Sequence, residues 1–506
     1  MSPPRALVAH VDLRSTHHGL ALAPQPAPAR TAVATCRRRP AHCGQRISAR
    51  QETILQHRWR SVWSWVEPVS SVAAIRLSSW KGRALSMSGV TRNSEWEYRG
   101  FVEALARSAK GSRPPFGTKA IGWGYRHLVK KMIFHMAPDK AHDFTVNYCR
   151  KFGKIPLLMD LLHSITGDDD IRLQTTAMGV RYYSPFGLSA GLDKNGQLLR
   201  VLDAAGFGFC SYGTMTADPC AGNPKPWFHR LPEHDSLLIH AGVPNDGAAE
   251  ILPKVDRTET PYGAKRHASI GYTNREYPDG VDGMIADFAR GVQLDMDSAA
   301  DVCEVNVSCP NLTAGKPFKD PVALDALFDR LDEVRSADGS RKPVLVKMPS
   351  ESPAVLDPML DVLTRHDVQG VATCNLLEDR SGYPDVPPEL EGGMSGKPCN
   401  ANAVRAVKWT REKYGDRFAI EGIGGVWDEV DALRMLDSGA DLVGFITTLM
   451  FNGPQRASEF KAALQAAWSQ LEAEGWEAKG LDYERWRNEK LNAADRERKL
   501  DGPVVD

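Results

Sequence analysis

Between residues 170 and 470, eight short apolar runs alternate with amphipathic segments, and this alternation limits the possible folds more than any other feature of the sequence. The runs predict strands at Gly187–Gly191, Phe207–Gly213, Ser269–Thr273, Val302–Ser308, Pro343–Met348, Gly370–Asn375, Phe418–Gly422 and Leu442–Thr447. Helices are predicted at Gln197–Ala205, Val281–Leu294, Val322–Val334, Pro353–Arg365, Asn402–Lys413 and Glu429–Asp437. The order predicts an α/β fold, a (β/α)8 TIM barrel. A doubly wound open sheet is the alternative, and no G-x-G-x-x-G follows the first strand to favour it.

The barrel is predicted to carry an N-terminal helical extension. We divide the chain into a targeting or disordered extension at 1–115, a helical segment at 120–165, the barrel at 170–475 and a charged tail at 476–506. In the helical segment, apolar residues recur at helical spacing from Tyr125 to Met136, and Pro138 begins a second helix. Such an apolar face can lie on a membrane surface or can pack on its own domain.

The first fifty residues hold eight arginines and only one acidic residue, Asp12. This composition is typical of an organelle transit peptide. The alternative is an over-extended gene model, with translation starting near Met87. No segment reaches the roughly 18 apolar residues of a membrane span.

Composition excludes several classes of function. Lysine plus arginine and aspartate plus glutamate number 63 each, so the net charge is zero and no nucleic-acid partner is indicated. Nine cysteines are scattered without a C-x-x-C pair. This pattern argues against a disulfide framework and against a metal site, and it favours a reducing compartment.

Polar side chains gather where the predicted strands end, which is the catalytic end of a parallel barrel. In Asn306–Asn311, a thiol at Cys309 stands between two amides, which suits proton removal from a bound substrate. The simpler reading is a buried cysteine at a strand–loop junction. Lysines follow two other strands, at Lys194 and Lys347, and a buried lysine needs an anionic partner such as a flavin ring or a barrel carboxylate.

Glycine-rich segments follow the later strands. Gly392–Lys397 follows the sixth strand, Gly424 and Gly425 follow the seventh, and Thr447 ends the eighth. Glycine amides with a hydroxyl-bearing turn after strands seven and eight form the usual phosphate site of this barrel. Together these segments predict a phosphate-bearing cofactor.

With these motifs, residues 123–470 resemble the dihydroorotate dehydrogenases. Asn306–Asn311 resembles the family's active-site loop and Pro343–Lys347 its flavin-contacting strand. The resemblance implies oxidation of dihydroorotate to orotate in pyrimidine biosynthesis, with FMN as cofactor and Cys309 as the base. It implies cofactor-binding residues Ala190, Gly191, Lys194, Thr214, Asn306, Lys347, Cys374, Ser395, Gly396, Gly424, Gly425 and Thr447, and substrate-binding residues Lys194, Asn306, Asn311 and Asn375.

Three stretches resemble the quinone-using, membrane-associated branch: Ala190–Gly196, Gly222–Glu233 and Ala137–His142. They imply that His142 and Arg230 lie near a quinone, that ubiquinone is the oxidant, and that the protein binds peripherally to a membrane. The implied location is the mitochondrial inner membrane, with a plastid or another membrane as the alternative.

The sequence departs from the family's pattern at four positions. Cys309 replaces the serine of the quinone branch, and Ile239, Gly271 and Leu376 replace polar residues that contact substrate or flavin. A free thiol titrates near pH 8.5, so Cys309 should support proton removal at lower pH than a serine would. Two rival functions follow from the lost polar contacts: a related flavin barrel acting on another dihydropyrimidine-like ring, and a catalytically silent flavin-binding protein.

Overall fold

The computed structural model describes residues 114–473 apart from 169, 171, 172 and 314, all within one compact unit. The predicted targeting extension, its alternative start at Met87 and the charged tail lie outside these residues, apart from the last two residues of the extension. No helix in the described part of the chain is long and apolar enough to cross a membrane.

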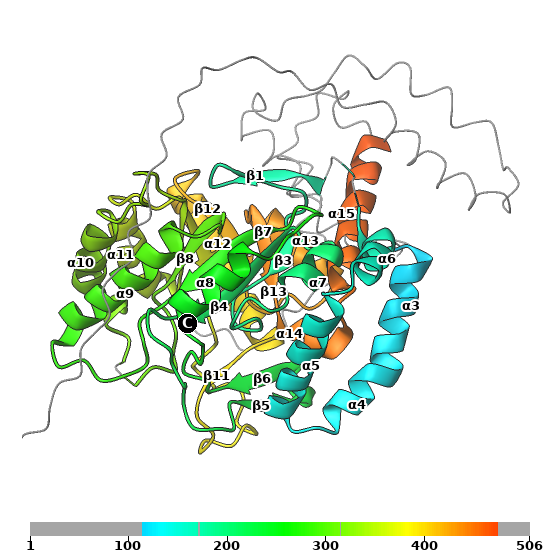
Figure 1. Ribbon diagram of the computed structural model, residues 1–506, viewed down its shortest axis with the longest axis horizontal. Coiled ribbons are helices and arrows are strands. Elements are labelled where there is room, and N and C mark those ends of the chain that lie inside the picture. Colours follow the sequence, from blue (N-terminus) through cyan, green and yellow to red (C-terminus); the bar gives the residue numbers. More distant parts are fainter. Residues whose placement is uncertain (1–113, 169, 171–172, 314, 474–506) are drawn as a thin grey trace, which may run out of the picture. The chain divides into compact units, whose positions relative to one another are not determined.

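Eight parallel strands close into a barrel in the order β10-β12-β13-β3-β4-β7-β8-β9 (Figure 1). The strands are β3 (Phe186–Leu188), β4 (Phe209–Met215), β7 (Lys265–Ile270), β8 (Val302–Asn306), β9 (Val344–Lys347), β10 (Gly370–Thr373), β12 (Ala419–Ile423) and β13 (Leu442–Phe445). The predicted TIM barrel is confirmed, and each predicted strand overlaps an observed one. The third strand begins four residues earlier than predicted, because charged residues open it: Lys265 and Arg266 both bond Asp301.

Helices surround the barrel. They are α7 (Leu199–Ala204), α8 (Ala248–Asp256), α9 (Gly280–Met296), α10 (Pro321–Leu331), α11 (Pro353–Leu363), α12 (Asn400–Tyr414), α13 (Glu429–Asp437), α14 (Thr447–Asn452) and α15 (Arg456–Ala473), with short 3-10 turns at Pro232–His234, Pro317–Lys319 and Lys397–Cys399. The six predicted helices are present. Helix α8 lies inside the long insertion after β4 and was not predicted.

Small sheets lie at the two ends of the barrel (Figure 1). At the amino ends of the strands, the hairpin of β1 (Thr175–Ala177) and β2 (Val180–Tyr182) packs Tyr182 against Phe209 and Ala419. At the carboxyl ends, β5 (Phe228–Leu231), β6 (Ser236–Ile239) and β11 (Gly393–Met394) form an antiparallel sheet. This second sheet lies over the end of the barrel where catalysis was predicted.

The N-terminal segment contains three helical parts, where the sequence predicted two. The first runs through α3 (Phe116–Gly124), a π-helical turn (Tyr125–Val129) and α4 (Lys130–Phe134), and α5 (Pro138–Phe152) and α6 (Pro156–Thr166) follow. Proline begins α5 as predicted and also begins α6. The first residue of a helix donates no hydrogen bond within the helix, so the amide proton that proline lacks is not missed there. Eleven of the fourteen exposed large hydrophobic side chains of the described residues lie between Phe116 and Leu161; the others are Tyr183, Leu294 and Val322.

Candidate active site

A cavity opens at the carboxyl ends of the barrel strands, and its empty volume is about 880 Å³ with the open mouth included. The predicted site residues that line it are His142, Ala190, Gly191, Lys194, Thr214, Asn306, Cys309, Asn311, Lys347, Asn375, Ser395 and Thr447. An adjoining cavity is lined by the remaining predicted cofactor residues, Cys374, Gly396, Gly424 and Gly425. The two cavities share seven lining residues, among them Lys347 and Thr447. The structure therefore brings together every predicted site residue except Arg230.

The floor of the cavity is a hydrogen-bonded group of amides and hydroxyls. Asn306 ends β8, and its Nδ2 donates to Thr214 Oγ1 at 2.7 Å. Its Oδ1 accepts from the backbone amide of Ser308 at 3.2 Å, which holds the start of the active-site loop. Asn375 Nδ2 donates to Ser308 Oγ at 3.0 Å. These bonds fix the planes of two amides that can face a planar polar ligand.

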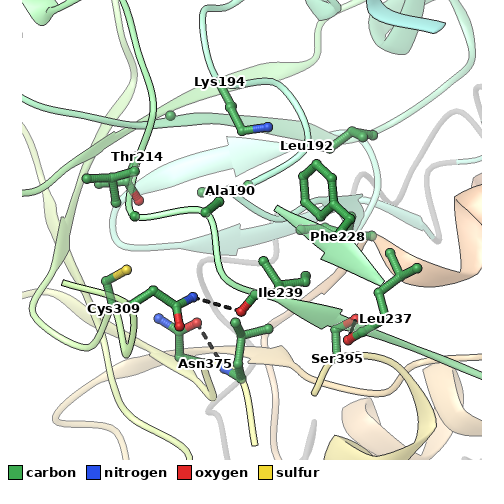
Figure 2. A pocket seen from close by; sticks show the side chains of 18 of the residues that line it. Ala190, Leu192, Lys194, Thr214, Phe228, Leu237, Ile239, Cys309, Asn375 and Ser395 are labelled. Carbon is green, nitrogen blue, oxygen red and sulfur yellow. Dashed lines mark hydrogen bonds between the residues drawn. The ribbon is translucent and has the colours of Figure 1, made fainter. Parts of the chain in front are cut away.

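Cys309 lies on one side of the cavity in Figure 2, opposite Phe228 and Leu237. Burial raises the pKa of its thiol to about 11, while the backbone amide of Asn311 and the charge of Lys347 oppose that rise. The pKa of this thiol is thus above its free value and still below that of a serine hydroxyl, and the expectation that Cys309 supports proton removal at lower pH than a serine stays a prediction. Cys309 is held as a thiol at neutral pH, and the thiolate is the form that can accept a proton.

Lys194 reaches the cavity from the loop after β3. Its Nζ lies 3.4 Å from His142 Nε2 and over the rings of Trp227 and Phe228, at 5.2 and 4.9 Å from their centroids. Burial lowers the pKa of Lys194 to about 8. Burial and the charge of Lys194 lower the pKa of His142, whose Nε2 donates to the carbonyl of Leu192 at 2.9 Å. The site thus presents one desolvated ammonium group beside a neutral imidazole.

The sequence did not identify the aromatic residues Trp227 and Phe228 as part of the site. They follow the Lys225–Pro226 pair in the insertion, and Trp227 is held by a bond from its backbone amide to Asp139 on α5. An aromatic pair in a proline-rich turn was the available signal. The insertion also supplies Leu237, Ile239 and Val243 to the cavity wall.

The adjoining cavity has the features of a phosphate site. Gly424 and Gly425 adopt φ values of 113° and 70°, and a Cβ on Gly425 would lie 2.5 Å from the backbone nitrogen of Asn400. Gly396 has a φ of 72°, and a Cβ there would meet the carbonyl of Asp235 at 2.2 Å. Thr447 Oγ1 donates to Ser395 Oγ at 2.9 Å. Only glycine fits at these positions. Without side chains there, the backbone amides and the hydroxyls of Ser395 and Thr447 are accessible to an oxyanion.

Lys347 lines both cavities, so a ligand that spans them would contact this lysine. Lys347 ends β9 between them, and its Nζ donates to the carbonyl of Ala190 at 3.4 Å. Its position suits a ring that carries negative charge.

The departures from the family pattern have structural counterparts. Ile239 and Leu376 both line the cavity with apolar side chains, although the Ile239 carbonyl accepts from Asn311 Nδ2 at 3.0 Å (Figure 2). A Cβ on Gly271 would lie 2.7 Å from Thr214 Cγ2. Thr214 therefore occupies the space that a larger residue at 271 would need.

Arg230 lines neither cavity. Its guanidinium donates to the carbonyls of Ile133, Phe134 and Met136 at 3.1, 3.4 and 2.8 Å, and it stacks over the ring of Phe134. It binds the end of α4 to β5. The predicted contact with a quinone stays a prediction.

Comparisons with known proteins agree with this geometry. The family profile described as dihydroorotate dehydrogenase matches residues 172–467. "Dihydroorotate dehydrogenase (quinone)" from Chloroflexus aurantiacus is 32% identical over 342 residues, which cover 65% of this chain and 93% of that protein. The protein of the same description from Mycobacterium sp. (strain KMS) is 32% identical over 358 residues, covering 70% and 96%.

Solved structures show the same fold. The crystal structure of DHODH from Eimeria tenella in complex with ferulenol matches with a TM-score of 0.58 at 24% identity, covering 66% of this chain and 93% of that one. The family match spans more than half of the chain and includes every strand of the barrel and every residue that lines the two cavities except His142. The chain therefore belongs to the dihydroorotate dehydrogenase family.

Proposed function

We propose that this protein oxidises dihydroorotate to orotate in pyrimidine biosynthesis, with FMN as the bound flavin and a quinone as the electron acceptor. One observation carries the proposal: Cys309, Lys194, the fixed amides of Asn306 and Asn375, and Lys347 all line one cavity. A base, a cation for a carboxylate and amides for a planar ring are what this substrate requires.

Each residue has a separate role in the proposed reaction. Bound FMN supplies the two-electron acceptor. Lys194 pairs with the substrate carboxylate, and the amides orient the ring. Cys309, once deprotonated, would take the C5 proton of the substrate. Lys347 would stabilise negative charge on a reduced flavin, and Ser395, Gly424, Gly425 and Thr447 would hold the phosphate.

The N-terminal helices supply the second half of the proposal. Their exposed apolar residues and basic flanks suit a peripheral site on a membrane, where a ubiquinone is dissolved. The mitochondrial inner membrane would provide both the lipid surface and the ubiquinone. An organelle location of this kind is what the composition of the first fifty residues favours.

A second candidate function rests on Ile239 and Leu376. Two apolar side chains in the cavity wall favour a dihydropyrimidine-like ring with fewer polar groups than dihydroorotate. Such an enzyme would keep the flavin site and lose preference for the carboxylate. A catalytically silent flavin-binding protein is the remaining alternative.

The purified protein should be yellow and should release FMN, and anaerobic dihydroorotate should bleach the flavin in a stopped-flow experiment. A dihydropyrimidine base without the carboxylate is the control substrate. Bleaching by that base alone would support the second candidate, and bleaching by neither would support a silent flavin protein. A colourless protein that cannot be reconstituted with FMN would remove the flavoenzyme proposal.

The affinity for dihydroorotate should fall as the pH rises through about 8. Burial depresses the pKa of Lys194 to that value, so the ammonium that pairs with the carboxylate is present below it and lost above it. If only the charged form binds, the dissociation constant rises about tenfold per pH unit above 8. Binding titrations from pH 6 to 10 measure this.

Lys194→Gln is the control for that titration. It should bind dihydroorotate about 10- to 100-fold more weakly at neutral pH, since it loses a charge-assisted hydrogen bond. Its affinity should not change near pH 8. A wild-type protein whose affinity is flat between pH 7 and 9 would show that Lys194 does not pair with the carboxylate.

A further inference from the structure

Four ionisable side chains are enclosed inside the barrel below the cavity. They are Glu304 on β8, Glu421 on β12, His267 on β7 and Lys347 on β9, and none is more than 5% exposed. Isolated charges in such an interior are costly, so buried charges are paired or neutralised. The charges of this group must therefore balance among its own members.

Glu304 is the partner of Lys347. Its Oε1 lies 3.9 Å from Lys347 Nζ and accepts a hydrogen bond from Ser269 Oγ at 2.6 Å. Ser269 Oγ is in turn 2.9 Å from Thr214 Oγ1, which lines the cavity. A chain of hydroxyls thus holds the Glu304 carboxylate in place under the lysine.

Glu421 has a different environment. Its Oε2 lies 3.6 Å from His267 Nδ1, and His267 Nε2 lies 3.0 Å from the hydroxyl of Tyr182. Among the described residues, neither oxygen of Glu421 has a hydrogen-bond partner. Room for the carboxylate comes from Gly444, because a Cβ there would lie 2.6 Å from Glu421 Oε1.

Counting charges leaves one carboxylate in excess. Lys347 balances Glu304, and a neutral His267 would leave the negative charge of Glu421 uncompensated in a dry interior. Burial is the main cause that raises the pKa of Glu421, and the charge of Glu304 raises it further, while His267 and Lys347 lower it. Burial and Glu421 also raise the pKa of Tyr182, so that hydroxyl keeps its proton.

We propose that Glu421 and His267 hold one exchangeable proton inside the barrel, and that this pair and Glu304 act through Lys347 to set the reduction potential of the flavin. The inference rests on the proposed function only in requiring that a flavin binds above Lys347. Glu304 and Glu421 are positioning residues, because neither lines the cavity.

The sign of the effect follows from electrostatics. Reduction brings two electrons and leaves negative charge near N1 and O2 of the flavin, beside Lys347. With the proton present, the interior is neutral and Lys347 is free to offset that charge. When the pair loses its proton to solvent at high pH, an added negative charge below Lys347 makes reduction less favourable. The proton is not transferred to the flavin in this scheme.

The test is the reduction potential of the FMN-loaded full chain as a function of pH, without dihydroorotate or quinone. The wild-type potential should fall more steeply above the pH at which the pair deprotonates. Glu421→Gln should match the wild type below that pH and lie above it at alkaline pH. The expected difference is at least tenfold in the ratio of oxidised to reduced flavin, about 30 mV for a two-electron couple.

A second variant separates the two carboxylates. Glu304→Gln removes a charge that keeps Glu421 protonated, so Glu421 should ionise and replace Glu304 as the partner of Lys347. The transition in potential should then move to lower pH. The infrared difference between the wild type and Glu421→Gln should contain the band of one buried protonated carboxyl, and at neutral pH the same band should be lost in Glu304→Gln as well. If Glu304→Gln does not fold, Ser269→Ala takes its place: it removes a hydrogen bond that stabilises the Glu304 carboxylate, so the two carboxylates should ionise together less easily and the transition should move to higher pH.

Asp295→Asn is the matched control. Asp295 is equally buried and lies 3.5 Å from Lys342, but it lines neither cavity. Its substitution should lower stability without moving the potential. If Glu421→Gln keeps the wild-type transition, or if the infrared band persists in that variant, the inference is overturned while the flavin assignment stands. A chain that takes up no FMN overturns the proposed function instead.

Discussion

Replacing Cys309 by alanine is expected to slow the reduction of bound flavin by dihydroorotate about 10²- to 10⁴-fold, the usual contribution of a general base. FMN content should not change, because Cys309 is not among the predicted cofactor-binding residues. Stopped-flow absorbance of the flavin measures both quantities. Cys149→Ala is the control, since Cys149 lies on α5 and lines neither cavity.

The pH dependence of the wild-type rate gives a second test of Cys309. Burial raises the pKa of its thiol to about 11, so the thiolate fraction, and with it the rate, should rise about tenfold per pH unit across the neutral range. A plateau beginning near pH 8.5 would mean that the bound substrate restores the ordinary thiol pKa. Flavin reduction at the wild-type rate in Cys309→Ala would remove Cys309 from the mechanism.

Removing apolar side chains from the N-terminal helices is expected to abolish binding to lipid vesicles and, with it, reduction of membrane-dissolved ubiquinone. Leu128, Met132, Leu157 and Leu161 are 63%, 50%, 75% and 56% exposed. Full burial of such a side chain is worth about 1.5–3 kcal/mol, so about 1 kcal/mol each is a low figure for insertion into the interface. Replacing all four by serine should weaken partition by about three orders of magnitude.

Vesicle sedimentation and a quinone assay measure this effect, and reduction of the flavin by dihydroorotate should stay unchanged. Val322→Ser is the matched control, because Val322 is 76% exposed but lies on α10, outside the helical segment. If the fourfold variant still binds vesicles, or if the wild type ignores ubiquinone and turns over with fumarate, the helices do not serve a membrane-dissolved acceptor.

The barrel could be predicted because most of its strands are largely apolar, are buried on both faces and alternate with amphipathic segments. Strands β5 and β6 were missed because each is only four residues long, and β5 has the polar residues His229 and Arg230 at its centre. The π-helical turn at Tyr125–Val129 leaves no trace in a pattern of helical spacing. The third strand was placed too late because it opens with Lys265 and Arg266: the Lys265 ammonium and the Arg266 backbone amide both donate to Asp301, and the Arg266 guanidinium donates to the Thr258 carbonyl.

For the site, residues at strand ends could be predicted because a parallel barrel collects them at one end. Glu304 and Glu421 could not be connected to Lys347 in the same way. They stand inside strands far apart in the sequence, and only closure of the barrel turns them toward a shared interior. The raised pKa of Cys309 was missed for a related reason, since burial of a loop residue depends on the sheet of β5, β6 and β11 that covers it.

The contact of Arg230 with the end of α4 has a mechanical consequence. Moving α4 away would break the three hydrogen bonds from the Arg230 guanidinium to the carbonyls of Ile133, Phe134 and Met136. Strand β5, which carries Arg230, pairs with β6, and β6 supplies Leu237 and Ile239 to the cavity wall. Arg230 thus connects α4 mechanically to the cavity wall, so a displacement of the helix would be transmitted through β5 and β6 to the shape of the cavity.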